Sequence, residues 1–226
     1  MRKTRFVIGQ FYHVYNRGVD KRSIFLNDRD YQRFMDSISS FNDVEPIGHL
    51  SRNVVHDSDE IKNMLIQISA FCLMPNHFHF LIEQKADDGI SKFLHRLLTG
   101  YTMYFNKRYE RSGALFQSTF KSKHVKNDSY LLQLSRYIHL NPLKILSPEC
   151  KEPTAADRLL KMYPWSSYRD FCQQSGMNKE NRKNMIVDMV GGPDDYRKFV
   201  VEYVRNNSLS NLNLSRLSLD KKGCGN

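Results

Sequence analysis

The sequence lacks the long hydrophobic runs that a membrane protein needs. No stretch of its 226 residues is apolar over the thickness of a bilayer, and the segment MRKTRFVIGQ lacks the apolar core of a secretory signal. The four cysteines are far apart and form no Cys-x-x-Cys pair, which argues against a disulfide framework and a structural zinc knuckle. We therefore expect a cytoplasmic protein with no membrane partner.

Acidic residues are in the minority. The chain has 24 Asp and Glu against 34 Lys and Arg, a net charge of +10. Such an excess is typical of proteins that bind polyanions, of which nucleic acid is the commonest. With 40% hydrophobic residues, a chain of this length can bury one good core and carry a small appendage. Composition therefore predicts a globular protein with a polyanionic partner. It does not indicate an activity, which has to be inferred from a candidate site.

Residues 69–83, SAFCLMPNHFHFLIE, have the pattern of a β-hairpin with a turn at Pro75-Asn76. Successive side chains on a strand point to opposite faces, so His77 and His79 should lie side by side on one face. Two imidazoles held in this way can occupy two positions of a divalent metal and leave others open for substrate. The alternative is a pair of histidines on a half-exposed strand, and the strand pattern alone does not choose.

Helices and strands are predicted on both sides of this hairpin. Apolar residues at helical spacing predict a helix over residues 28–41 and a long one over 90–109. Period-two alternation predicts a first strand over residues 6–16 and a basic strand within 111–126. The polar residues 42–63 predict a loop or small insertion.

A further helix is expected to begin after Asn127 and to end at Pro142. One edge of it carries two phenols and two amides at helical spacing, namely Tyr130, Gln133, Tyr137 and Asn141. A tyrosine followed four residues later by a metal-capable amide is the notable arrangement. The alternative is that Tyr137 is a boundary aromatic and Asn141 a helix cap. His139 points away from Tyr137, so we expect it to be structural.

Four segments in this order resemble the single-tyrosine HUH transposases, most closely their REP-associated branch. They are MPNHFHFLI (74–82), ALFQSTFKSKHV (114–125), YIHLNPLK (137–144) and YPWSSYRDF (163–171). The resemblance covers about residues 9–171 and implies an α+β fold, a ferredoxin-like antiparallel sheet with packed helices. Residues 1–172 would form the HUH domain, with an insertion at about 42–63. Residues 173–226 would form a C-terminal extension, partly helical and then loosely ordered.

The resemblance also implies the roles of individual residues. His77 and His79 would be metal ligands, and Asn141 would take the third ligand position. Tyr137 would be the nucleophile that cleaves single-stranded DNA beside a hairpin and stays linked to the 5′ end. The implied cofactor is Mg²⁺ or Mn²⁺, although two imidazoles and an amide alone would favour zinc or manganese. Both a monomer and a homodimer occur in the family, and the sequence leaves this choice open.

Basic side chains in several segments are candidate contacts to the DNA backbone. They are Arg2, Lys3, Arg5, Arg17, Lys21, Arg22, Lys121, Lys123, Lys126 and Arg136. For any one of them, a solvated surface charge is the alternative, and lysines on an edge strand also discourage aggregation.

Two other functions compete with the transposase. A metal phosphodiesterase would use the histidines to activate water and would leave Tyr137 as scaffolding. A catalytically silent protein derived from such an enzyme would bind hairpin DNA without cleaving it.

Overall fold

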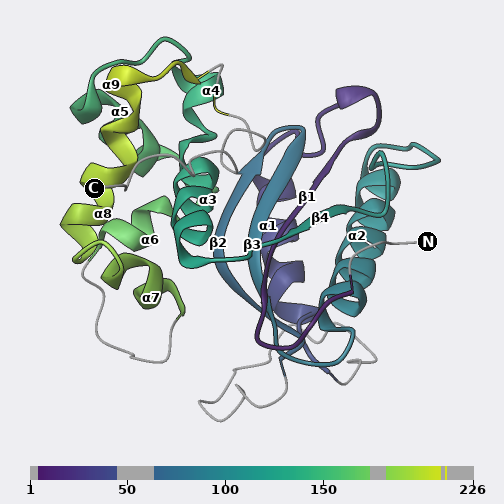
Figure 1. The fold of residues 1–226 in the computed structure, drawn as a ribbon. Helices are drawn as coiled ribbons and strands as arrows, with labels where there is room; N and C mark the ends of the chain where they lie inside the picture. Colours follow the sequence, from purple (N-terminus) through teal and green to yellow (C-terminus); the bar gives the residue numbers. More distant parts are fainter. Residues whose placement is uncertain (1–4, 45–63, 174–181, 210–211, 213–226) are drawn as a thin grey trace. The chain divides into compact units, whose positions relative to one another are not determined.

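The computed structural model describes residues 5–44, 64–173, 182–209 and 212 (Figure 1). The chain divides into two compact units. The sheet unit comprises Met1–Ile68 and Pro75–His124, and the helical unit comprises Ser69–Met74 and Val125–Asn226. The domain boundary expected after residue 172 stays a prediction. The expected insertion at about 42–63 falls almost wholly outside the described residues.

Four strands form one sheet in the order β2-β3-β1-β4 (Figure 1). They are β1 (Phe11–Arg17), β2 (Ile66–Met74), β3 (His77–Gln84) and β4 (Lys121–His124). β1 is antiparallel to both β3 and β4, and the turn at Pro75-Asn76 joins β2 to β3 as predicted. The expected α+β fold, an antiparallel sheet with packed helices, is confirmed.

Two predicted strands are shorter than expected. β1 begins at Phe11 because Gly9, with φ +79°, turns the chain, and Gln10 N–H donates to the Val7 carbonyl. The basic strand is confined to β4, because the preceding residues make loop hydrogen bonds in place of a ladder. The side-chain amide of Asn16 donates to the carbonyls of Ser118 and Thr119, at 2.8 and 3.0 Å.

Two helices cover one face of the sheet. The short 3₁₀ helix η1 (Val19–Lys21) leads toward α1 (Asp28–Ser40), which Asn27 caps, and α2 (Gly89–Arg108) follows the hairpin. Phe34 of α1 contacts Phe78 and Phe80 of β3, and Tyr101 of α2 packs edge-on against Phe34. The apolar side of the β3 strand is therefore buried under α1 and α2, and its histidines belong to the opposite face.

The helical unit surrounds α3 (Asp128–Leu140), which Asn127 caps as predicted. The other helices are α4 (Leu143–Leu146), α5 (Pro153–Met162), α6 (Tyr168–Cys172), α7 (Arg182–Asp188), α8 (Pro193–Val201) and α9 (Tyr203–Asn206). α8 packs against α3, α5 and α6, and its Tyr196 and Val200 are fully buried. The described part of the C-terminal extension thus contains α7, α8 and α9, and the end expected to be loosely ordered lies almost wholly outside the described residues. No helix in the described ranges has the length and apolar character needed to cross a bilayer.

Candidate functional site

The strand register places His77 and His79 together on one face of the sheet. Their ring centroids are 5.0 Å apart and the ring planes stand at 88°. Across the β1-β3 pair, Arg17 lies opposite His77 and Tyr15 lies opposite His79. Directly opposed residues of an antiparallel pair point to the same face, so the two imidazoles share it with a guanidinium and a phenol.

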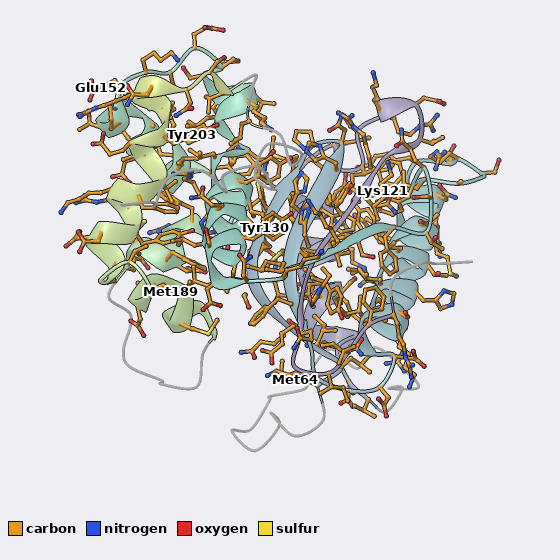
Figure 2. All side chains as sticks on the ribbon, viewed as in Figure 1. Met64, Lys121, Tyr130, Glu152, Met189 and Tyr203 are labelled. Carbon is orange, nitrogen blue, oxygen red and sulfur yellow. The ribbon has the colours of Figure 1, made fainter. Side chains whose placement is uncertain are left out.

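The lysines of β4 belong to the same face. Lys121 lies opposite Tyr15 and Lys123 lies opposite His13, and both lysines are exposed (Figure 2 labels Lys121). We call the face that carries His13, Tyr15, Arg17, His77, His79, Lys121 and Lys123 the histidine face. It combines two possible metal ligands with three exposed cations, which suits a phosphate-bearing ligand.

An amide fixes the orientation of the His77 ring. Nδ1 of His77 lies 2.6 Å from Oδ1 of Asn76, whose Nδ2 donates to the Lys21 carbonyl at 3.1 Å. Because the amide nitrogen is used on Lys21, the amide oxygen accepts, and Nδ1 of His77 carries the proton. A ring protonated at Nδ1 has its lone pair at Nε2, which is how metal-binding histidines are commonly held. His77 therefore fits a metal bound through Nε2.

A second imidazole contacts the His79 ring. Nε2 of His13 lies 3.0 Å from Nδ1 of His79, and the two rings are stacked at 15° with centroids 5.2 Å apart. Burial, and secondarily the ammonium of Lys123, lower the pKa of His13 to about 3. The His13 ring is therefore neutral at pH 7 and has one nitrogen that can accept a hydrogen bond.

The helical unit carries the predicted nucleophile and amide on α3. Tyr137 is 6% exposed. Nδ2 of Asn141 donates to the Tyr137 carbonyl at 2.7 Å, so the amide caps the helix end and its Oδ1 is the atom suited to a metal. Nζ of Lys144 lies 4.9 Å from the centroid of the Tyr137 ring. Burial lowers the pKa of Lys144 to about 8, partly offset by Cys72.

The predicted ligands and nucleophile fall into two groups. The sheet unit brings together His77 and His79, and α3 places Tyr137 one turn before Asn141. Because these groups belong to different compact units, their meeting stays a prediction. Within the described part of the chain, no group of three or more His, Cys, Asp or Glu side chains could hold a metal. Asn141 as the third ligand, which the resemblance implies, stays a prediction.

The other predicted DNA contacts have varied surroundings. Arg5, Lys21, Arg22 and Lys126 are exposed, whereas Arg2 and Lys3 lie outside the described residues. Arg136 is half-buried against two rings of the helical unit: its guanidinium carbon lies 4.4 Å from the Phe199 ring centroid and 4.7 Å from that of Tyr203. The cation–π contacts give Arg136 a packing role that the sequence did not predict.

His139 is structural, as expected. It is fully buried, and its two ring nitrogens lie 2.8 Å from the Tyr196 hydroxyl and 2.8 Å from Oγ of Ser167. Both nitrogens are thus used within the helical unit, and the ring joins α3 to α8.

The sequence did not predict that His13 and Tyr15 belong to the histidine face. Their alternation in the first strand was the available signal, but it does not reveal which strand lies opposite.

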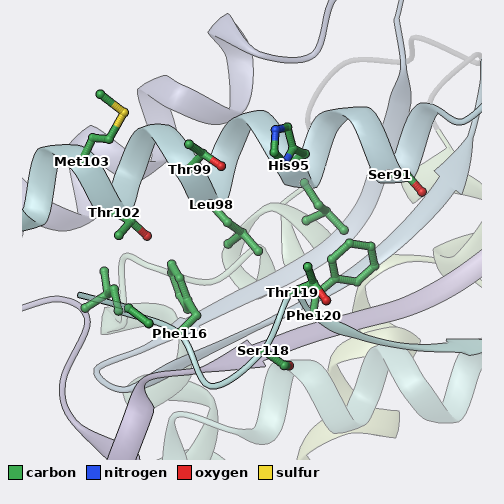
Figure 3. A pocket seen from close by; sticks show the side chains of 13 residues that line it. Ser91, His95, Leu98, Thr99, Thr102, Met103, Phe116, Ser118, Thr119 and Phe120 are labelled. Carbon is green, nitrogen blue, oxygen red and sulfur yellow. The ribbon is translucent and has the colours of Figure 1, made fainter. Parts of the chain in front are cut away.

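A pocket of about 550 Å³ opens beside the sheet (Figure 3). One wall is a stripe of α2 that includes His95, Leu98 and Thr102, and the other is the loop of residues 114–120 with Phe116 and Phe120. Figure 3 shows side chains of the two walls facing each other. Gln117 N–H donates to the Arg17 carbonyl at 2.9 Å, which ties this loop to the end of β1 that pairs with His77.

Comparison with known proteins supports the resemblance seen in the sequence. Residues 49–141 match the model of the family described as "Transposase IS200 like". A solved structure described as a REP-associated tyrosine transposase bound to a REP hairpin is similar with a TM-score of 0.50 and 16% identity. The match covers 75% of this chain and 83% of that one, and at this identity it establishes the fold. No curated protein matches the chain. Residues 49–141 of this chain are thus similar to the IS200-like transposases, in agreement with the resemblance that its motifs indicated.

Proposed function

We propose that the chain is a metal-dependent single-strand DNA endonuclease and transposase that acts near a hairpin through Tyr137. The observation that carries this proposal is the histidine face, where His77 and His79 lie on one side of a stiff sheet with Arg17, Lys121 and Lys123. Metal-capable imidazoles and phosphate-binding cations on one surface suit phosphoryl transfer. The relative described above was solved with a REP hairpin, which motivates the choice of substrate.

In the proposed reaction, the Tyr137 oxygen attacks a phosphorus of the bound strand. The new bond joins Oη of Tyr137 to phosphorus, and the bond to the 3′ oxygen breaks. The products are a 5′-phosphotyrosine and a free 3′ hydroxyl, so the proton lost by the phenol is balanced by the one the 3′ oxygen gains. The covalent link conserves the phosphodiester energy for rejoining, which suits strand transfer.

His77, His79 and the amide oxygen of Asn141 are the proposed ligands for Mg²⁺ or Mn²⁺. A divalent ion there supplies Lewis-acid stabilisation of charge on a phosphate oxygen. An ordinary tyrosine has a pKa near 10 and is a weak nucleophile at neutral pH, so such activation of the phosphate matters. Arg17, Lys121 and Lys123 would position the strand through its phosphates.

Labelled hairpin DNA with single-stranded flanks, incubated with Mn²⁺ or Mg²⁺ and run on a denaturing gel, tests the proposal. The wild type should form a covalent DNA-protein band that Tyr137→Phe abolishes. Tyr130→Phe is the matched control, because Tyr130 lies two turns earlier on the same helix and is also buried (Figure 2).

The other outcomes identify the competing functions. Cleavage that survives in Tyr137→Phe without a covalent band means that water is the nucleophile, and the chain is then a metal phosphodiesterase. Hairpin binding without cleavage under either metal means a silent binding protein. Either result overturns the proposal.

A further inference from the structure

We propose that His13 is a positioning residue that holds His79 in the tautomer needed for metal binding. This inference rests on the proposed function, because it gives His79 the role of a ligand. Nε2 of His13 and Nδ1 of His79 are 3.0 Å apart, so the two rings share one N–H···N hydrogen bond. One of the two nitrogens must donate and the other accept.

Only one direction of this bond is compatible with a ligand. If Nδ1 of His79 donates, the lone pair of that ring lies at Nε2, which can coordinate. If Nδ1 accepts, Nε2 of His79 carries the proton and cannot coordinate. His77 shows the first arrangement, since its Nδ1 donates to an Asn76 amide that is fixed by the Lys21 carbonyl. His13 would do for His79 what Asn76 does for His77.

The position of His13 suits this role. The side chain is fully buried on β1, and its ring is stacked on that of Tyr15 with centroids 4.8 Å apart. His13 lies opposite Leu81 and diagonal to His79 in the strand register, within the reach of a long side chain. A fully buried ring stacked on Tyr15 has few other orientations, so it can define the tautomer of His79.

The first test reads the tautomer directly. In protein selectively labelled with ¹⁵N-histidine, without metal and at pH 7.5, the His79 ring should show a protonated Nδ1 and an unprotonated Nε2. His13→Leu should move His79 toward the Nε2–H form, and His13→Gln should retain the Nδ1–H form, because its amide oxygen can accept in place of Nε2. A wild-type His79 protonated at Nε2 overturns the proposal, and this measurement needs no variant.

The second test measures Mn²⁺ affinity by electron paramagnetic resonance in the Tyr137→Phe background, where no chemistry follows. We expect His13→Leu to weaken Mn²⁺ binding about 10- to 100-fold, and His13→Gln to change it less than about threefold. Equal affinity of folded His13→Leu and its parent would contradict the positioning role. Absence of Mn²⁺ binding in the parent would instead defeat the proposed function, while the tautomer result could still stand.

A separate observation concerns the pocket between α2 and residues 114–120. We infer that it receives an unpaired nucleobase of the DNA strand that crosses the histidine face, an inference that also rests on the proposed function. None of the described residues that line it is Lys, Arg, Asp or Glu, so it suits a neutral group better than a phosphate. Its volume of about 550 Å³ is within the range of small-molecule sites.

The chemistry of the walls fits a base. Phe116 and Phe120 supply aromatic surface, and hydroxyl groups that donate and accept surround them, at Ser91, Thr99, Thr102, Ser118 and Thr119. Lys121 follows Phe120 directly on the edge strand β4, and its side chain lies on the histidine face, opposite to the face that α2 covers. A DNA strand whose phosphate is bound at Lys121 would therefore pass around the β4 edge to place a base in the pocket. The loop wall belongs to the ALFQSTFKSKHV motif, and this site would give that motif a function.

Filling the pocket tests this inference. Thr102→Trp should weaken binding of a hairpin with an unpaired flank about tenfold and leave binding of a blunt hairpin unchanged within about twofold. The matched control Thr102→Val removes only the hydroxyl and should bind both DNAs within about threefold of wild type. Equal effects of Thr102→Trp on both DNAs, or none on either, would overturn the inference.

Photocrosslinking of the wild-type chain gives a second readout that does not depend on the folding of a variant. Oligonucleotides with 5-iodouracil in the unpaired flank should crosslink to Phe116, Phe120 or Met103. Crosslinks that map only to other parts of the chain would contradict a base in this pocket. Loss of cleavage in Tyr137→Phe has no bearing on this experiment, so the two proposals can fail separately.

Discussion

The two compact units use histidine in opposite ways. In the helical unit, His139 is fully buried and its two ring nitrogens contact Tyr196 and Ser167, each at 2.8 Å. In the sheet unit, His77 and His79 are each held through Nδ1, by an amide and by another imidazole. A ring used at both nitrogens cross-links elements, whereas a ring held at Nδ1 is oriented for coordination through Nε2.

This contrast shows what to look for in a candidate metal site. Residue type does not distinguish His79 from His139, since both are buried and hydrogen-bonded. The distinction lies in their hydrogen-bond partners. Both ring nitrogens of His139 contact hydroxyl groups of other segments, whereas the hairpin places the imidazoles of His77 and His79 side by side. Mutations of the two kinds of histidine should therefore change different properties of the protein.

The largest expected effect is on chemistry. His79→Ala should lower the rate of covalent-adduct formation by about 10³-fold, because a metal ligand is lost, and the gel assay with Mn²⁺ measures this. His124→Ala is the control: His124 is on β4 but lies opposite Tyr12, so it faces away from the histidine face. Equal losses in the two variants would mean that the sheet, and not the ligand, was damaged.

The next effect is on folding. His139→Phe should lower the free energy of unfolding by about 2–3 kcal/mol, because two buried hydrogen bonds are lost within the helical unit. Urea unfolding followed by circular dichroism measures this. His95→Phe, at an exposed position on α2, should stay within about 0.5 kcal/mol of wild type. A His139→Phe variant as stable as wild type would contradict the structural role of His139.

A smaller effect should appear in DNA binding. The double variant Lys121→Gln, Lys123→Gln should weaken hairpin binding about tenfold at 150 mM salt and lower the salt slope of log K by about two. Fluorescence anisotropy from 50 to 300 mM salt measures both quantities. The control is the double variant Lys92→Gln, Lys107→Gln on α2, which changes the net charge by the same amount. It should leave the salt slope of log K nearly unchanged. Equal slopes in the two double variants would mean that only overall charge matters.

The smallest effect concerns pH and Lys144. The unfolded lysine holds its proton up to pH 10.5, but in the folded protein its pKa is lowered to about 8 by burial, so unfolding takes up a proton between these values. The free energy of unfolding of the wild type, measured relative to that of Lys144→Met, should therefore rise between pH 8 and 10.5. The expected rise is about 1–2 kcal/mol, because Lys144 is partly exposed and solvent reduces the effect. Urea titrations of both proteins in a Cys72→Ala background at pH 8, 9 and 10 measure the difference, because Lys144 and the Cys72 thiol shift each other's pKa. A constant difference would contradict the lowered pKa.

Much of the local structure was predictable from periodicity. The hairpin at Pro75-Asn76, the helix capped by Asn27 and the helix capped by Asn127 were all placed within a few residues, because their signals lie in short stretches of chain. The basic strand was too long in the prediction. Its N-terminal half is fixed as a loop by Asn16, a residue about a hundred positions earlier, and no local pattern records that contact.

The candidate site was predictable to the same degree. Neighbours on one element, such as His77 with His79 or Tyr137 with Asn141, follow from strand and helix periods. Arg136 was predicted to contact DNA, yet it stacks on Phe199 and Tyr203, which only the fold of the helical unit brings to it. The contact of Arg136 with DNA stays a prediction, and so does the proximity of Tyr137 to His77 and His79.

Local patterns were enough to predict the helices, the strands and the residue pairs within each of them, because a strand or helix repeats over two to four residues. The folded sheet was needed to show which residues of other strands share the face of the histidine pair, namely His13, Tyr15, Arg17, Lys121 and Lys123. These neighbours depend on strand register: a shift of one residue would turn every one of these side chains to the other face, and register is set by the packing of segments far apart in the chain.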